Sequence, residues 1–196
     1  MDIADAAKSE VLRPLATVFV PGMLAVSPYV IVAQHYVPRV LTFWHDHDAA
    51  FTAIIVACML AAGLLLEDLG ALLESQLIDP RLEHKDPDHI AVWRQYLQLR
   101  IKDEYVGQRY LRTIVTRLKF ELAMLPAIIS LWLGLLWVQC IHSVWTTRSF
   151  FVLSGFLASI GLYLFIEARL SAGLLSSTRK LLVSALAAAD NAPPAV

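Results

Sequence analysis

The amino-acid sequence predicts an all-α integral membrane protein: a four-helix bundle whose second and third spans extend into a cytoplasmic helical hairpin. Long stretches of the chain carry no charged residue, the clearest running from Leu122 to Thr147, and about 18 apolar residues suffice for a membrane-spanning helix. The hydrophobic fraction is 58%, the charged fraction 17% and the mean hydropathy +0.60, against roughly half apolar and a quarter charged in soluble domains. Because the charges are segregated into blocks, a soluble apolar bundle is the weaker alternative.

The first span is expected between Arg13 and Arg39, a stretch without acidic or basic residues. It is too long for the apolar region of a signal peptide and has no convincing small-residue cleavage site, so we interpret it as a retained helix. Pro21 and Pro28 lie inside it. Prolines are tolerated in membranes when neighbouring helices satisfy the freed carbonyls, so we expect a kinked helix packed among others.

The second span is expected to begin after Asp48 and to end at Glu67 and Asp68. Small residues recur at every fourth position, which is typical of close contact between membrane helices; they are Ala53, Ala57 and Ala61. The helical pattern continues beyond the membrane and is predicted to stop at the Asp79-Pro80 pair.

A polar turn over residues 79–89 should lead into a soluble amphipathic helix that begins near Asp88. Apolar residues repeat there at helical spacing; they are Ile90, Trp93, Leu97 and Ile101. A second amphipathic helix over residues 104–120 should continue without a break into the third span. Gly107 is expected to loosen the join between the two helices.

The third span follows Glu121, with Pro126 expected to kink it, and the fourth lies between Arg148 and Glu167. The fourth carries two pairs of small residues four apart, Ser154 with Ala158 and Gly155 with Ser159. From Arg169 onward we expect a separate short helix followed by a frayed end. Cys58 and Cys140 lie in apolar runs and are predicted to be buried free thiols.

These elements divide the chain into four parts. Residues 1–71 hold the first two spans, 72–118 the cytoplasmic helical hairpin, 119–168 the last two spans, and 169–196 a cytoplasmic helix and tail. Of the 16 basic residues, only Arg39 and Arg148 fall in the two loops opposite the hairpin. Because basic residues favour the cytoplasm, both termini and the hairpin are predicted to be cytoplasmic, in the plasma membrane or a bacterial inner membrane.

Four acidic residues are predicted at one depth, the inner membrane boundary; they are Glu67, Asp68, Glu121 and Glu167. Such a ring could surround the mouth of a cation pathway. The simpler interpretation, which we favour, is a set of interfacial ion pairs that fix helix depth and register. Glu121 lies nearest the apolar run and is the first candidate for mutation.

A basic face on the helix over residues 104–120 is the second candidate surface; it contains Arg109, Arg112, Arg117 and Lys119. We expect it to contact anionic lipid headgroups, each Lys or Arg contributing about 1 kcal/mol near such a surface. Pairing with acidic residues of the segment 67–88, in a helical hairpin, is an alternative. Nucleic acid is not expected as a partner, and the lack of a Gly-rich phosphate loop argues against nucleotide binding.

His45 and His47 alternate with aspartates in the first outer loop. They could supply metal ligands if the chain were extended there, but a polar loop beside the interfacial residue Trp44 is the favoured interpretation. No catalytic motif is present, and we expect neither a cofactor nor a resident metal.

The sequence therefore favours a non-enzymatic membrane oligomer that forms or gates a membrane pathway, such as an ion channel, under control of its cytoplasmic helices. A membrane anchor that recruits a soluble partner through residues 72–118 is the alternative. A small metal or lipid transporter or enzyme is the third hypothesis, supported only by His45 and His47.

Overall fold

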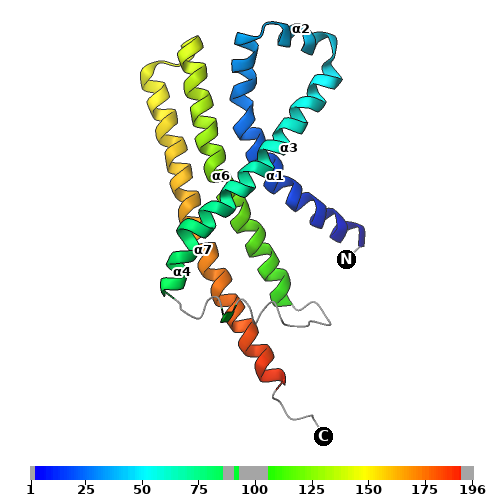
Figure 1. Ribbon diagram of the computed structural model, residues 1–196, viewed down its shortest axis with the longest axis vertical. Coiled ribbons are helices and arrows are strands. Elements are labelled where there is room, and N and C mark those ends of the chain that lie inside the picture. The colour runs from blue at the N-terminus through cyan, green and yellow to red at the C-terminus, as the bar shows by residue number, and fades with distance from the viewer. Residues whose placement is uncertain (1–2, 86–90, 93–105, 191–196) are drawn as a thin grey trace.

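The computed structural model of the protein describes residues 3–85, 91–92 and 106–190, and the described part is helical almost throughout (Figure 1). Its elements in chain order are α1 (Ile3–Tyr36), α2 (Arg39–Asp46), α3 (Asp48–Leu73), the π-helix η1 (Glu74–Ile78), α4 (Asp79–Lys85), α6 (Val106–His142) and α7 (Thr147–Asp190).

Four of these helices, α1, α3, α6 and α7, are long and apolar enough to cross a membrane. In each of the last three, about 20 residues, or about 30 Å of helix, separate a glutamate from the loop at the other end. This length matches the hydrocarbon core of a bilayer, about 30 Å. The predicted all-α class and the four apolar helices are therefore confirmed. We call the two ends of the molecule the charged end, marked by Glu67, Glu121 and Glu167, and the loop end.

α6 is the central helix and packs against α1, α3 and α7 (Figure 1). α1 also crosses α3, and the crossing depends on two glycines. A Cβ atom on Gly22 would lie 1.8 Å from the carbonyl oxygen of Met59, and one on Gly63 would lie 2.0 Å from that of Val18. Both distances are far below van der Waals contact, so only glycine permits the two backbones to approach this closely.

The carbonyl freed by Pro28 of α1 is satisfied from within the same helix, not from a neighbouring helix as predicted. Pro28 cannot donate to the carbonyl of Leu24, and the Ser27 hydroxyl donates to that oxygen instead, at 3.2 Å. α6 adds a contact one residue further along, where Ser130 Oγ donates to the carbonyl of Ala25 at 3.4 Å. In the other direction, Tyr29 Oη donates to the carbonyl of Ser130 at 3.1 Å. These bonds join α1 to α6 inside the apolar layer.

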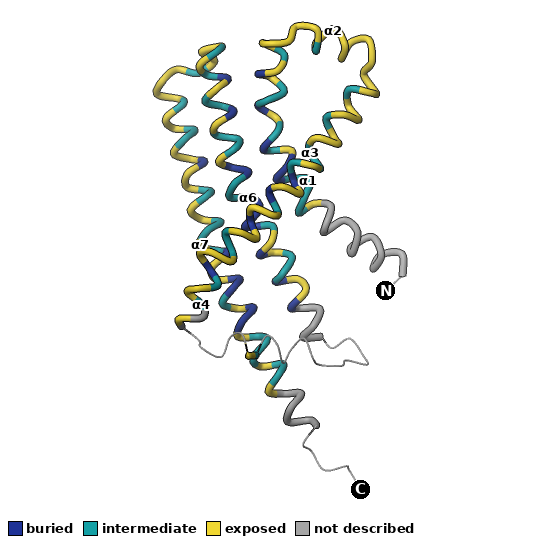
Figure 2. The backbone as a smooth tube through the Cα atoms, in the orientation of Figure 1, coloured by how far each residue is buried: buried dark blue, intermediate teal, exposed yellow. Residues whose placement is uncertain are grey.

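The larger hydrophobic core lies at the charged end, whereas much of the surface toward the loop end is exposed (Figure 2). Its buried residues come from η1, α6 and α7; they are Ile78, Leu111, Ile114, Leu118, Leu122, Ala168, Ala172 and Leu175. The second cluster is smaller and lies between the spans, with Ala25, Leu66 and Ala127. The helices are therefore held together most extensively where they pass the charged end.

α7 is longer than predicted. It continues through Glu167 and Arg169 to Asp190 as one helix, where the sequence predicted a separate short helix. The continuation is amphipathic, since Ala168, Ala172 and Leu175 enter the larger core, and this burial against α6 stabilises a single straight helix.

The extension of α3 also differs from the prediction. The helix does not stop at Asp79-Pro80 but passes through η1 into α4. Pro80 is in the first turn of α4, where a missing N–H is tolerated. The helix predicted from Asp88 lies outside the described residues, apart from residues 91–92, so the complete cytoplasmic hairpin stays a prediction. Gly107 lies within α6, so no break is seen there.

The prediction that the two cysteines are buried is wrong. Cys58 and Cys140 are free, as predicted, but exposed on the helix surface. The Ala53, Ala57 and Ala61 stripe is exposed too, and a Cβ atom on Gly155 would meet nothing within 4 Å. Among the described glycines, those at which helices of the chain approach each other most closely are Gly22, Gly63 and Gly134. Contact of the exposed small residues with further copies stays a prediction.

Candidate functional site

Ion pairs at the charged end connect three of the four long helices. Arg117 of α6 donates through Nε to Glu121 Oε1 at 2.7 Å and through its terminal guanidinium nitrogen to Glu167 Oε2 on α7 at 2.5 Å. Lys119 Nζ lies 2.8 Å from Glu67 Oε1 on α3. We call these five residues together with Ser171 the charged layer. α6 supplies both cations, so its ion pairs link it to α3 and to α7 at the charged end.

Glu121 is the buried member of the charged layer, with 4% of its surface exposed. Its second oxygen, Oε2, accepts a hydrogen bond from Ser171 Oγ of α7 at 2.9 Å. Both carboxylate oxygens are therefore bonded, as the burial of a charged group requires. The Arg117 side chain is 55% exposed, so water screens the cationic side of the pair and weakens it relative to a fully buried one.

The predicted acidic residues do not form a ring of equal members. Glu67, Glu121 and Glu167 each bond to a cation of α6. Asp68 is exposed and has no ion pair with any residue whose side chain is described. The three paired acids fit the simpler interpretation, in which ion pairs fix helix depth and register, since their charges are compensated within the chain.

The predicted basic face is divided by this arrangement. Arg117 and Lys119 point their charges at glutamates of the charged layer. Arg112 is exposed one turn further from the spans and has an interaction of its own. Arg109 lies in α6, but its side chain is outside the described part. Contact of this face with lipid headgroups stays a prediction.

Sequence reasoning missed Ser171 because it ended the span at Glu167. A signal was available, since Ser171 lies four residues after Glu167 and four positions apart is the same face of a helix. A continuous helix there places both residues toward α6.

At the loop end, His45 belongs to α2 and His47 follows it. The chain is helical through Asp46, so the extended geometry on which the predicted metal pair depended is not met. The ring of His47 contacts that of Phe43, with centroids 5.1 Å apart, and His45 lines a surface cavity of about 550 Å³ with Asp48. Among the residues that the structure describes, no group of three or more His, Cys, Asp or Glu side chains is placed to hold a metal ion.

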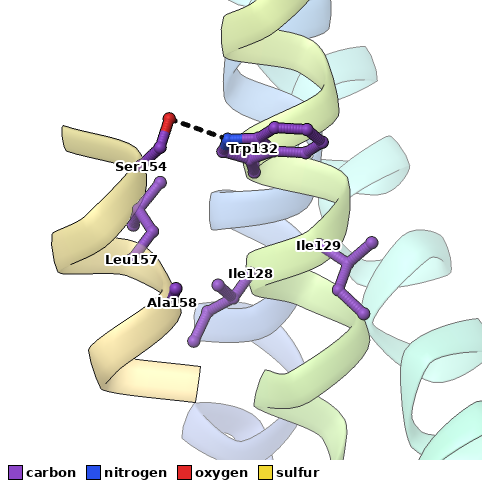
Figure 3. Close-up of a pocket in the computed structure, with 6 residues that line it drawn as sticks. All are labelled: Ile128, Ile129, Trp132, Ser154, Leu157 and Ala158. Atoms are coloured by element: carbon purple, nitrogen blue, oxygen red, sulfur yellow. Dashed lines mark hydrogen bonds between the residues drawn. The ribbon is translucent and has the colours of Figure 1, made fainter. Parts of the chain in front are cut away.

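An apolar groove lies between α6 and α7 toward the loop end, with a volume of about 310 Å³ (Figure 3). Its lining residues are Ile128, Ile129, Trp132, Ser154, Leu157 and Ala158. At one end of it Trp132 Nε1 donates to Ser154 Oγ at 3.0 Å, which satisfies both polar groups (Figure 3). The groove therefore offers only apolar surface and lies at hydrocarbon depth, where lipid tails can fill it.

Comparison with known proteins adds no identity to these sites. No family model, no curated protein and no solved structure matches the chain. The charged layer is the candidate functional site because it combines a buried carboxylate with ion pairs from three helices.

Proposed function

We propose that the protein is a non-enzymatic, oligomeric membrane protein that forms or gates a membrane pathway, with the charged layer holding the closed arrangement. The observation that carries the proposal is the bridge made by Arg117 to Glu121 and Glu167. It lies where α6 and α7 leave the apolar layer and enter the larger core.

The Arg117 bridge is suited to control a membrane pathway because the two helices that it joins are continuous. α6 and α7 run unbroken from the loop end through the charged layer to the larger core. A displacement of their ends beyond the charged layer, which the proposal places in the cytoplasm with both termini, must shift the spans or break the bridge. Two discrete arrangements of such a bridge would provide the bistable element that gating requires.

The pathway itself is proposed to form between subunits. Each acid of the charged layer is neutralised within its own chain, so one copy does not supply an open anionic mouth. The exposed faces of α3 and α7, with Ala57 and Gly155 among their small residues, are compatible with contacts to further copies.

Reconstitution into liposomes with an ion-flux assay tests this proposal. Glu121→Gln and Glu167→Gln keep the side-chain volume but weaken the Arg117 bridge, so we expect flux at least several times that of the wild-type protein. Asp68→Asn is the matched control, since Asp68 lies at the same depth outside the ion pairs, and it should leave flux unchanged. If neither the wild-type protein nor either bridge variant conducts, the pathway proposal fails.

A membrane scaffold is the second candidate, favoured by a different observation. The larger core lies beyond the apolar layer and supports exposed cations, among them Arg112, that could recruit an acidic soluble partner through residues 72–118. In that case Arg112→Glu should abolish co-purification of the partner while membrane insertion and liposome flux stay as in the wild-type protein.

A further inference from the structure

Two histidines that the charged layer does not involve face each other at the loop end. His35 is in the last turn of α1 and His142 ends α6. Their ring centroids are 5.0 Å apart and the ring planes are nearly perpendicular, at 88°. The two residues are far apart in the sequence, so the packing of α1 on α6 creates the pair.

The pair opens onto a cavity of about 600 Å³, and both imidazoles line it. The other lining residues are Ile31, Gln34, Leu41, Val138, Val144 and Trp145. No carboxylate or cationic side chain is among them, so the imidazoles are the strongest ligands available there. The cavity leaves room for water beside the rings.

The distance between the rings is that of an ordinary edge contact, and it is also compatible with a shared metal ion. Two imidazoles that bind one tetrahedral Zn²⁺ through nitrogens at about 2.0–2.1 Å have ring centres about 5 Å apart. A direct His–His contact would need no particular cavity, whereas a metal with two protein ligands needs space for water molecules to complete its coordination. Imidazole is also a ligand that suits zinc, copper and nickel.

We propose that His35 and His142 form a binding site for a divalent transition-metal ion, which two imidazoles and water ligands hold at the loop end. The bound ion would join the end of α1 to the end of α6. This site is separate from His45 and His47, and it does not depend on the pathway or scaffold function.

The six histidines of the chain allow a direct test with full-length protein in nanodiscs, purified without a polyhistidine tag. One variant keeps only the pair, by replacing the other four histidines with glutamine (His45, His47, His84 and His89). A second variant, His35→Gln with His142→Gln, removes only the pair. Zn²⁺ is titrated into each protein by calorimetry.

We expect the pair-only protein to bind one Zn²⁺ per chain with the affinity of the tightest wild-type site, within about threefold. The variant without the pair should bind at least tenfold more weakly. Equal affinity in the variant without the pair, or loss of the site from the pair-only protein, would overturn the proposal.

A spectroscopic readout keeps the test decisive if the double variant does not fold. Electron paramagnetic resonance of Cu²⁺ bound to the pair-only protein should show two coordinating imidazole nitrogens. Adding His35→Gln to that protein should reduce the number to one or abolish binding. A single coordinating nitrogen in the pair-only protein itself would contradict a shared ion.

Discussion

The charged end and the loop end of the molecule are held together by different interactions. At the charged end, ion pairs from α6 reach both α3 and α7, and a continuous apolar core packs beneath them. At the loop end, α3 is largely exposed and the contacts are mostly aromatic edges and local hydrogen bonds, such as that between Gln139 and Trp145. Lipid tails compete equally for every apolar face of a span. The arrangement of the spans therefore depends on the ion pairs and the larger core at the charged end, and on the glycine contacts where α1 crosses α3.

The largest loss of stability is expected at the crossing of α1 and α3, which lies between the charged end and the loop end. Gly63→Ala places a Cβ atom 2.0 Å from the carbonyl oxygen of Val18, so the two backbones must move apart. Overpacking of this kind costs about 1–3 kcal/mol or more, measured as lost stability in unfolding of the protein in detergent micelles. Gly161→Ala is the control, since a Cβ there meets nothing within 4 Å, and a similar loss in both variants would show that the crossing is not special.

The second effect tests the charged end. Glu121→Ala removes the buried acceptor for Arg117 and for Ser171, leaving the Ser171 hydroxyl unsatisfied. We expect a loss of about 2 kcal/mol, less than the 3–5 kcal/mol of a fully buried pair because Arg117 remains exposed and keeps Glu167. The same unfolding measurement checks it, with Asp68→Ala as the matched acid outside the layer. Equal costs for the two variants would mean that the charged layer does not hold the helices.

The third effect concerns the loop end. Gln139 holds the turn between α6 and α7 through two hydrogen bonds, donating from Nε2 to the carbonyl of Trp145 at 2.7 Å and accepting at Oε1 from its N–H at 2.9 Å. Gln139→Leu should cost about 1–2 kcal/mol, at about 0.5–1 kcal/mol for each of the two part-buried hydrogen bonds. Hydrogen exchange should rise at the turn and stay unchanged at the charged end; a rise at both ends would show that the ends unfold together.

The smallest effect is expected in the groove between α6 and α7. Ser154→Ala removes the acceptor for Trp132 Nε1, and hydrogen bonds between membrane helices contribute about 0.6 kcal/mol on average. The unfolding free energy should therefore fall by no more than about 1 kcal/mol. Ser159→Ala provides the comparison, because Ser159 bonds only within α7 among the described contacts, and an equal loss there would show that the bond to Trp132 does not join the helices.

The sequence contained enough to predict the four apolar helices and the grouping of three glutamates at one end of them. Charge-free runs mark the spans, and Glu67, Glu121 and Glu167 mark their ends. It was not sufficient to predict which faces meet, because a helix in lipid is apolar on every side and carries no amphipathic pattern. For that reason the close approach of α1 to α3 at Gly22 and Gly63 was not predicted.

The candidate sites show the same division between local and tertiary information. The sequence grouped Lys119 with the four acids at one end of the spans, whereas it assigned Arg117 to a surface facing lipid or a partner. The ion pairs that Arg117 and Lys119 make depend on how α3 and α7 rotate about α6. The facing of His35 and His142 joins helix ends that are remote in the sequence, and no local periodicity indicates it. α2 was missed because a helix of eight residues is too short for its pattern to stand out from a polar loop.

The contact of Gly22 with Gly63 has a mechanical consequence. Two rods that touch at one point can rotate about it, so any movement that brings α1 and α3 together on one side of the contact separates them on the other. α2 connects their ends at the loop side and limits how far they can spread there. The separation of α1 and α3 should therefore increase at one membrane surface when it decreases at the other. Distances between probes attached to α1 and α3 at each surface would record these opposite changes.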